Sequence, residues 1–85
     1  MAITVEISYY PLMDDYEKPI ENFLEKLAEN KKITLESGTM SSILTGSYED
    51  VMESLNRQLK PFLKEYPSVF TLKISNACAA CKIPE

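Results

Sequence analysis

The order in which hydrophobic periodicities follow one another constrains the fold of this chain most. Short segments bounded by proline or glycine, most of them alternating between apolar and polar residues, predict four strands, over residues 3–9, 33–37, 40–45 and 69–75. Two longer segments carry apolar residues at helical spacing, one over 16–29 and one that begins after Ser47. The predicted order of elements is therefore β-α-β-β-α-β.

This order predicts the architecture directly. Right-handed crossovers place both helices on one face of a four-stranded antiparallel sheet, which is the ferredoxin-like α+β sandwich. A length of 85 residues suits a single domain over 1–85. Residues 76–85 show no periodicity, so we expect an irregular C-terminal tail there.

Several residues predict where the helices begin and end. Asp14 and Asp15 are candidate N-caps for the first helix, and Ser47 is the candidate for the second. Pro19 is expected in the first turn, where its missing N–H costs little. Pro61 is expected to kink or end the second helix near Lys60.

The helices leave one sheet face uncovered. The first strand contributes Thr4, Glu6, Ser8 and Tyr10 to it, and the last contributes Thr71, Lys73 and Ser75. The strand over 40–45 presents either Ser41, Ile43 and Thr45 or Met40, Ser42 and Leu44, because apolar groups occur on both of its sides. A strand that is apolar on both sides favours a covered sheet and hence a dimer. The pattern alone, however, favours an ordinary polar face in contact with water.

Charge and composition restrict the function. The net charge is −4, which disfavours nucleic acid and anionic membrane surfaces and favours a cationic or neutral ligand. The chain contains no histidine, the commonest general base, and no paired acid and base is evident, so we expect no enzymatic activity. The first residues do not resemble a signal peptide, and no apolar run is long enough to span a bilayer, so we expect a cytoplasmic protein.

The side chains of the uncovered face could also bind a ligand. Hydroxyl groups of Ser, Thr and Tyr both donate and accept hydrogen bonds, which suits a heteroaromatic ring with amino and ring-nitrogen groups. Glu6 and Glu36 could neutralise a positive charge. Tyr9 and Tyr10 could stack on such a ring. Tyr16 and Tyr48 lie on the apolar helix stripes and are predicted to fill the core.

Cys78 and Cys81 form a C-x-x-C motif near the chain end. Two thiolates make half of a zinc site, so a thiol-based metal carrier is an alternative function. The motif does not open a helix after a strand, as a redox pair normally does. Two small, semi-buried residues at a sheet edge are the interpretation we favour.

Two segments resemble a known family. Ile7-Ser8-Tyr9-Tyr10-Pro11 is similar to the end of strand one in YkoF-type thiamine/hydroxymethylpyrimidine-binding proteins, and Ser41-Ser42-Ile43-Leu44-Thr45-Gly46 is similar to their strand three. The resemblance implies a non-catalytic, cofactor-free protein that binds thiamine or its pyrimidine moiety and is linked to thiamine precursor uptake or salvage.

The same resemblance implies how the ligand is held. Ser8, Tyr10, Ser41 and Ser42 match the motifs, and the adjacent Thr39 is a plausible further contact; Glu6 and Glu36 are added from charge alone. The sheets of the family pack in pairs, so a single-domain chain would form a homodimer or a higher homo-oligomer through its sheet face. A structural or regulatory module, which this fold often supplies, is a further alternative.

Overall fold

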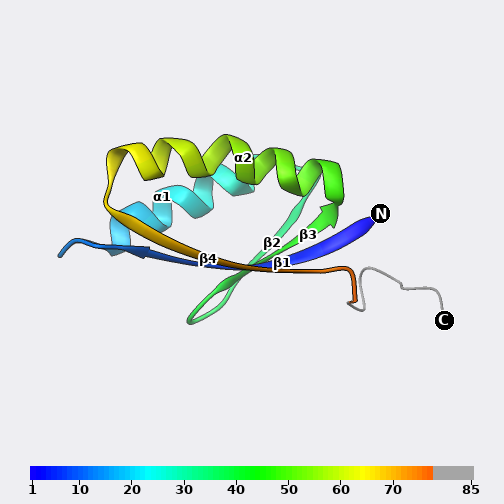
Figure 1. Cartoon of the computed structure of the whole chain (residues 1–85), viewed down its shortest axis with the longest axis horizontal. Helices are drawn as coiled ribbons and strands as arrows, with labels where there is room; N and C mark the ends of the chain where they lie inside the picture. Colours follow the sequence, from blue (N-terminus) through cyan, green and yellow to red (C-terminus); the bar gives the residue numbers. More distant parts are fainter. Residues whose placement is uncertain (78–85) are drawn as a thin grey trace.

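The computed structural model describes residues 1–77, which form two layers. Two helices lie side by side on one face of a four-stranded sheet (Figure 1). The elements follow the predicted order: β1 (Ala2–Pro11), α1 (Glu17–Ala28), β2 (Thr34–Ser37), β3 (Ser42–Ser47), α2 (Tyr48–Glu65) and β4 (Ser68–Ser75). The ferredoxin-like α+β prediction is confirmed.

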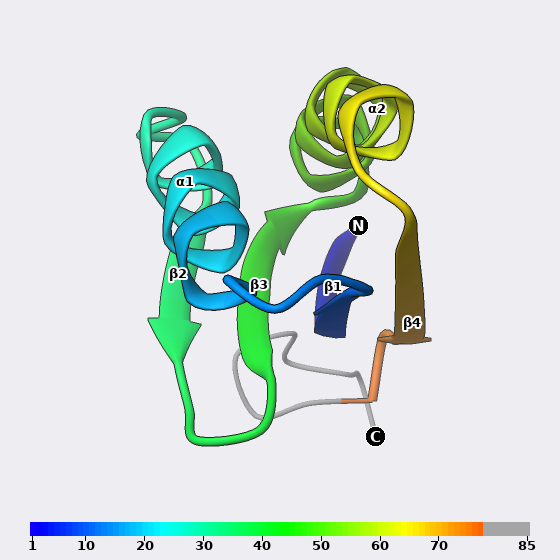
Figure 2. The same cartoon turned by 90° about the vertical axis from the view of Figure 1, so that its left-hand side faces the viewer.

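The strands are arranged β2-β3-β1-β4, as Figure 2 shows from left to right. Every neighbouring pair is antiparallel, so β1 is a central strand bonded to β3 on one side and to β4 on the other. The register places Glu6 opposite both Ile43 and Lys73. Central strands hold their side chains more firmly than edge strands, so the β1 residues form the frame of the uncovered face.

Alternation along β1 divides its side chains between the core and the uncovered face. Ile3, Val5 and Ile7 point toward the helices and are buried, as the period of two predicts. The remaining core consists of buried apolar residues from both helices, from β3 and from the loop before β2: Phe23, Leu27, Ile33, Leu44, Val51, Leu55 and Phe62. Burial of these groups supplies most of the driving force for folding.

The core has two chemically different ends. At the Pro11 end of β1, the ring of Tyr9 stacks on Phe70 with centroids 4.2 Å apart and meets Phe23 and Phe62 edge-on. At the other end of β1, Ile3 pairs with Gly46, which lies against Ile33 and Val51, so the buried side chains around it are aliphatic. The aromatic end of the core lies next to the β2–β3 hairpin tip, because Tyr9 and Phe23 line the same recess as Gly38 and Thr39 of the turn.

Strand β3 begins and ends two residues later than predicted. The backbone N–H of Gly38 donates to the carbonyl of Ser41 at 2.8 Å, which closes the turn over 38–41 and delays the strand. Gly46 continues the strand instead of ending it. A Cβ at Gly46 would lie 3.2 Å from Ile33 and 3.3 Å from Val51, so a larger residue there would have to displace these buried side chains.

The structure overturns two expectations about where the helices begin and end. Asp14 and Asp15 do not cap α1, because Tyr16 occupies the N-cap position and makes no capping hydrogen bond through its side chain. Pro61 does not end α2, which runs on to Glu65. Its ring is exposed, and burial of the neighbouring Phe62 holds the helix against the core across the missing N–H. By contrast, Ser47 caps α2 as predicted by accepting the N–H of Asp50.

Candidate functional site

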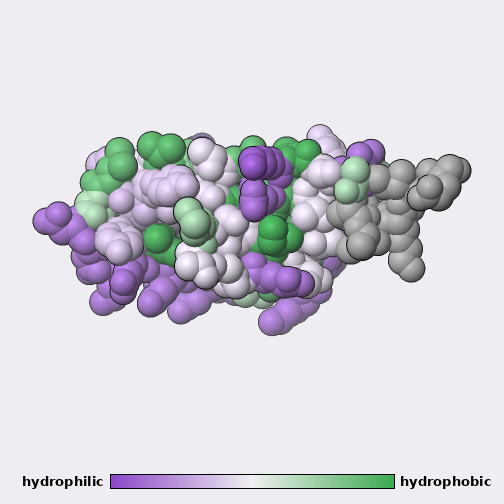
Figure 3. Space-filling view, turned by 90° about the horizontal axis from the view of Figure 1, so that it is seen from below, coloured by the Kyte–Doolittle hydropathy of each residue, from purple (hydrophilic) through white to green (hydrophobic). Residues whose placement is uncertain are grey.

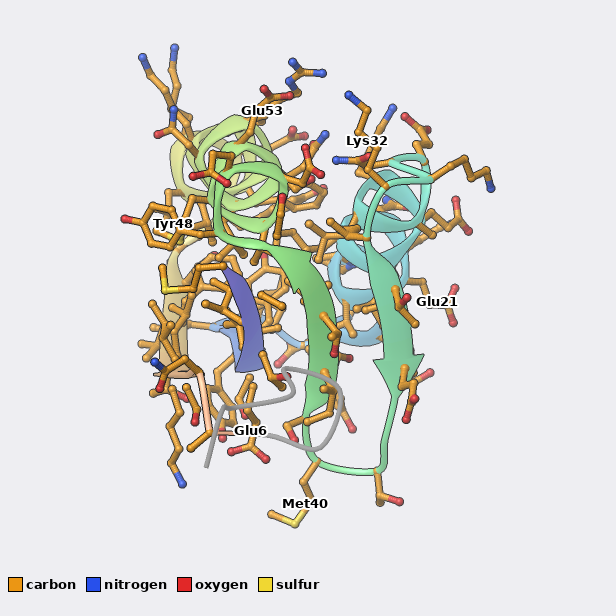
Figure 4. The ribbon with its side chains drawn as sticks, turned by 90° about the vertical axis from the view of Figure 1, so that its right-hand side faces the viewer. Glu6, Glu21, Lys32, Met40, Tyr48 and Glu53 are labelled. Carbon is orange, nitrogen blue, oxygen red and sulfur yellow. The ribbon has the colours of Figure 1, made fainter. Side chains whose placement is uncertain are left out.

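The carboxylate of Glu6 stands on the central strand β1, in the middle of the uncovered face. It points away from the helices (Figure 4), and its Oε2 accepts a hydrogen bond of 3.1 Å from the hydroxyl of Ser41. The Nζ of Lys73 lies 3.7 Å from Oε1. Because the Lys73 side chain is 86% exposed, this ion pair is weak and can be exchanged for another cation.

Weakly polar residues surround this carboxylate. Figure 3 views the molecule from below and shows pale, charged and apolar side chains interspersed over the uncovered face. The register resolves the open question about β3: Ser42 and Leu44 are buried toward the helices, and Ser41, Ile43 and Thr45 belong to the uncovered face. The face therefore carries apolar area as well as hydroxyl groups.

A recess of about 110 Å³ lies where β1 approaches the turn between β2 and β3; we call it the hairpin cavity. The hydroxyl of Ser8 donates to the Met40 carbonyl at 3.3 Å and so ties the turn to β1. The cavity lies between this turn and α1, and its lining includes Ile7, Ser8, Tyr9, Ile20, Phe23, Gly38, Thr39, Met40, Ser41 and Ser42. Hydroxyl groups thus line one side of the cavity, and apolar core residues line the other.

A second cavity of about 330 Å³ adjoins the first; we call it the tyrosine cavity. It shares Tyr9, Ile20, Thr39 and Met40 with the hairpin cavity and adds Tyr10, Pro11 and Tyr16. Tyr10 and Tyr16 are each about half exposed, at 48% and 51%. Two tyrosine rings are therefore available to contact a ligand without loss of core packing.

The family profile of the YKOF-related family matches residues 2–79, which is nearly the whole chain. The chain belongs to the YKOF-related family. No curated protein matches this YKOF-related chain.

Solved structures share the fold of this family member. A protein from Streptococcus pneumoniae superimposes with a TM-score of 0.81 and 15% identity over 96% of this chain and 93% of its own. A protein from Thermotoga maritima, named for a proposed role in thiamine biosynthesis or salvage, gives 0.77 and 20% identity over 88% of this chain and 83% of its own. At such low identities the likeness shows a common fold.

The structure brings most of the predicted site residues of this YKOF-related chain together. Ser8, Thr39, Ser41 and Ser42 line the hairpin cavity, and Tyr10 lines the tyrosine cavity. Glu6 lines neither cavity but is hydrogen bonded to Ser41, which does. Glu36 lies on β2 in the same cross-strand row as Ile43 and Glu6, and it lines neither cavity.

Sequence reasoning misplaced three residues, of which Tyr16 and Met40 line this site. Tyr16 was predicted to fill the core, but it is the residue before the first turn of α1, is half exposed, and lines the tyrosine cavity. Tyr48 was predicted wrongly for the same reason, since it begins α2 and is exposed. Met40 forms the hairpin tip (Figure 4), and only the turn signal at Gly38 could have placed it there.

Within the described residues we find neither a candidate metal site nor a helix that could span a membrane. No group of three or more Asp, Glu, Cys or His side chains that could hold a metal ion occurs within residues 1–77. Cys78 and Cys81 lie outside the described residues. In the part of the chain that the structure describes, neither helix is long and apolar enough to cross a bilayer.

Proposed function

We propose that this chain is a non-catalytic binding protein for thiamine or its hydroxymethylpyrimidine moiety, with the ligand in the joined hairpin and tyrosine cavities. One observation carries the proposal. Three hydroxyl-bearing residues, Ser8, Thr39 and Ser41, line the hairpin cavity, and two tyrosines, Tyr10 and Tyr16, line the tyrosine cavity that adjoins it. The role we propose for the protein is in thiamine precursor uptake or salvage.

The side chains that line the hairpin and tyrosine cavities match such a ligand chemically. An aminopyrimidine offers ring-nitrogen acceptors and an amino donor, and hydroxyl groups can serve both. Thiamine also carries a positively charged thiazolium ring, for which tyrosine faces and the carboxylate of Glu6 are suitable partners. The net charge of −4 also favours a cation. The name of the Thermotoga maritima protein with the same fold agrees with this choice.

We propose further that a second copy of the chain covers the uncovered face. Ile43 is half-buried and Val69 exposed on that face, among polar neighbours, so contact with another sheet would remove apolar area from water. The hairpin cavity opens beside this face, because Ser8 and Ser41 belong to both. A homodimer would therefore also close the ligand site.

Isothermal titration calorimetry with thiamine and with hydroxymethylpyrimidine tests the binding. We expect saturable heat that Ser41→Ala weakens by up to about tenfold, since one hydrogen bond contributes about 0.5–1.5 kcal/mol. Thr34→Ala is the matched control, because Thr34 is an exposed β2 residue that lines neither cavity. Absence of heat with thiamine, its phosphates and hydroxymethylpyrimidine would refute the proposal.

Analytical ultracentrifugation tests the homodimer separately. Ile43→Glu places a third carboxylate beside Glu6 and Glu36, so like-charge repulsion across the two sheets should release monomers. A wild-type protein that is monomeric at all concentrations contradicts the dimer and leaves the binding proposal to the calorimetry.

A further inference from the structure

A basic cavity lies on the far side of the molecule from the proposed ligand site. It occupies the groove between the end of α1 and the middle of α2 and has a volume of about 430 Å³. Figure 4 shows Lys32 in the loop after α1 and Glu53 on α2, both at the outer surface of the helix layer. Its lining residues are Lys26, Glu29, Asn30, Lys31, Lys32, Glu53, Ser54, Arg57 and Gln58.

The charge of this lining is opposite to that of the chain. Four of the nine basic residues of the sequence gather here, against two carboxylates, so the lining carries an excess of two positive charges. The whole chain has a net charge of −4. A cationic site in an acidic protein concentrates positive potential where an anion can be held.

Two of these cations are weakly engaged and two have no ion pair. Lys26 lies 3.8 Å from Glu29, and Arg57 lies 3.3 Å from Glu53; all four side chains are more than half exposed. Such surface pairs contribute little and exchange readily. Within residues 1–77, neither Lys31 nor Lys32 forms an ion pair.

The floor of the cavity is fixed by neutral hydrogen bonds. The Nδ2 of Asn30 donates to the Ser54 hydroxyl at 2.6 Å, and its Oδ1 accepts the backbone N–H of Lys32 at 2.9 Å. Ser54 is only 5% exposed. The Asn30 side chain therefore holds the loop after α1 against α2, so the backbone that carries Lys31 and Lys32 is positioned before any ligand arrives.

We propose that this cavity binds the phosphate or pyrophosphate group of a small phosphorylated molecule. A phosphate dianion matches the excess of two positive charges, and Lys and Arg are the side chains that recognise phosphate oxygens. The amide of Gln58 adds a neutral donor to the lining. Basic residues are common at the C-terminal ends of helices, where they interact favourably with the helix dipole. This effect could account for the lysines at the end of α1, but it does not account for Arg57 in the middle of α2. The inference does not depend on the proposed function.

Nuclear magnetic resonance titration of ¹⁵N-labelled protein with pyrophosphate and with phosphate tests this site at constant ionic strength. We expect saturable shifts at the amides of 30–32 and 53–58, with a dissociation constant below about 1 mM for pyrophosphate. The double variant Lys31→Ala/Lys32→Ala should weaken binding at least about tenfold. The double variant Lys18→Ala/Lys64→Ala is the matched control, because it removes two exposed charges outside the cavity.

A third variant separates a binding site from general charge effects. Glu53→Gln removes a competing carboxylate and frees Arg57, so pyrophosphate should bind several-fold more tightly. Shifts that do not saturate, or that spread equally over all lysine-rich segments, would overturn the proposal. An equal loss of affinity in the control double variant would also overturn it, because it would show binding through net charge alone.

Discussion

Asn30 follows α1 in a surface loop, where substitutions usually change stability by less than about 0.5 kcal/mol. Replacement of Asn30 by alanine should nevertheless destabilise the fold much more. The side chain makes two hydrogen bonds, one to Ser54 and one from the Lys32 backbone. Each contributes about 0.5–1.5 kcal/mol, so Asn30→Ala should lower the free energy of unfolding by about 1–3 kcal/mol. In a chain of this size each kcal/mol corresponds to about 4–8 °C in Tm.

The partner substitution should cost less, and the difference is the sharper test. Ser54→Ala removes one bond, and the half-buried Asn30 amide that remains can reach water. We therefore expect a loss of only about 0.5–1 kcal/mol. The double variant should show a coupling of about 1 kcal/mol, because both residues form the same hydrogen bond.

Urea unfolding followed by circular dichroism measures these free energies. Asn22→Ala is the control, since Asn22 is an exposed α1 residue and should change stability by less than about 0.5 kcal/mol. If Ser54→Ala lowers the free energy of unfolding as much as Asn30→Ala does, or if the coupling is zero, then Asn30 does not stabilise the fold through these two hydrogen bonds.

Two further predictions concern α2. Pro61→Ala should stabilise the protein by about 1–2 kcal/mol, because it restores a helix N–H at an exposed position; an unchanged urea midpoint would contradict this. Desolvation and the Glu65 carboxylate raise the pKa of Tyr66 above its ordinary 10.0. The folded state thus favours the neutral phenol, and stability should fall as the pH rises past 10; Tyr66→Phe should reduce that fall in pH-dependent unfolding.

The fold was predictable from the sequence because local periodicity and global topology agree. The alternation of Ile3, Val5 and Ile7 with polar neighbours gave the inward face of β1, and Ser47 gave the start of α2. The element boundaries were harder. The turn before β3 depends on a backbone bond between Gly38 and Ser41, which no side-chain pattern encodes.

The site was predictable only in part, because it depends on pairing across strands. Ser8 and Ser41 could be chosen by resemblance, but the contact of Glu6 with Lys73 requires the register between β1 and β4. Tyr16 falls at the spacing of a core residue, and yet it lies at the N-cap of α1 and is half exposed. Periodicity gives the direction of a side chain, and tertiary structure decides whether anything lies in that direction.

The division of the core into an aromatic and an aliphatic end determines what spectroscopy can detect. The sequence has no tryptophan, so near-ultraviolet signals from the packed interior arise from Tyr9 and the phenylalanines around it. Those rings lie beside the hairpin and tyrosine cavities. Loosening at Ile3 and Val5 would pass almost unseen in such spectra. Near-ultraviolet circular dichroism of this protein therefore monitors one half of the interior, and amide hydrogen exchange is needed to follow the other.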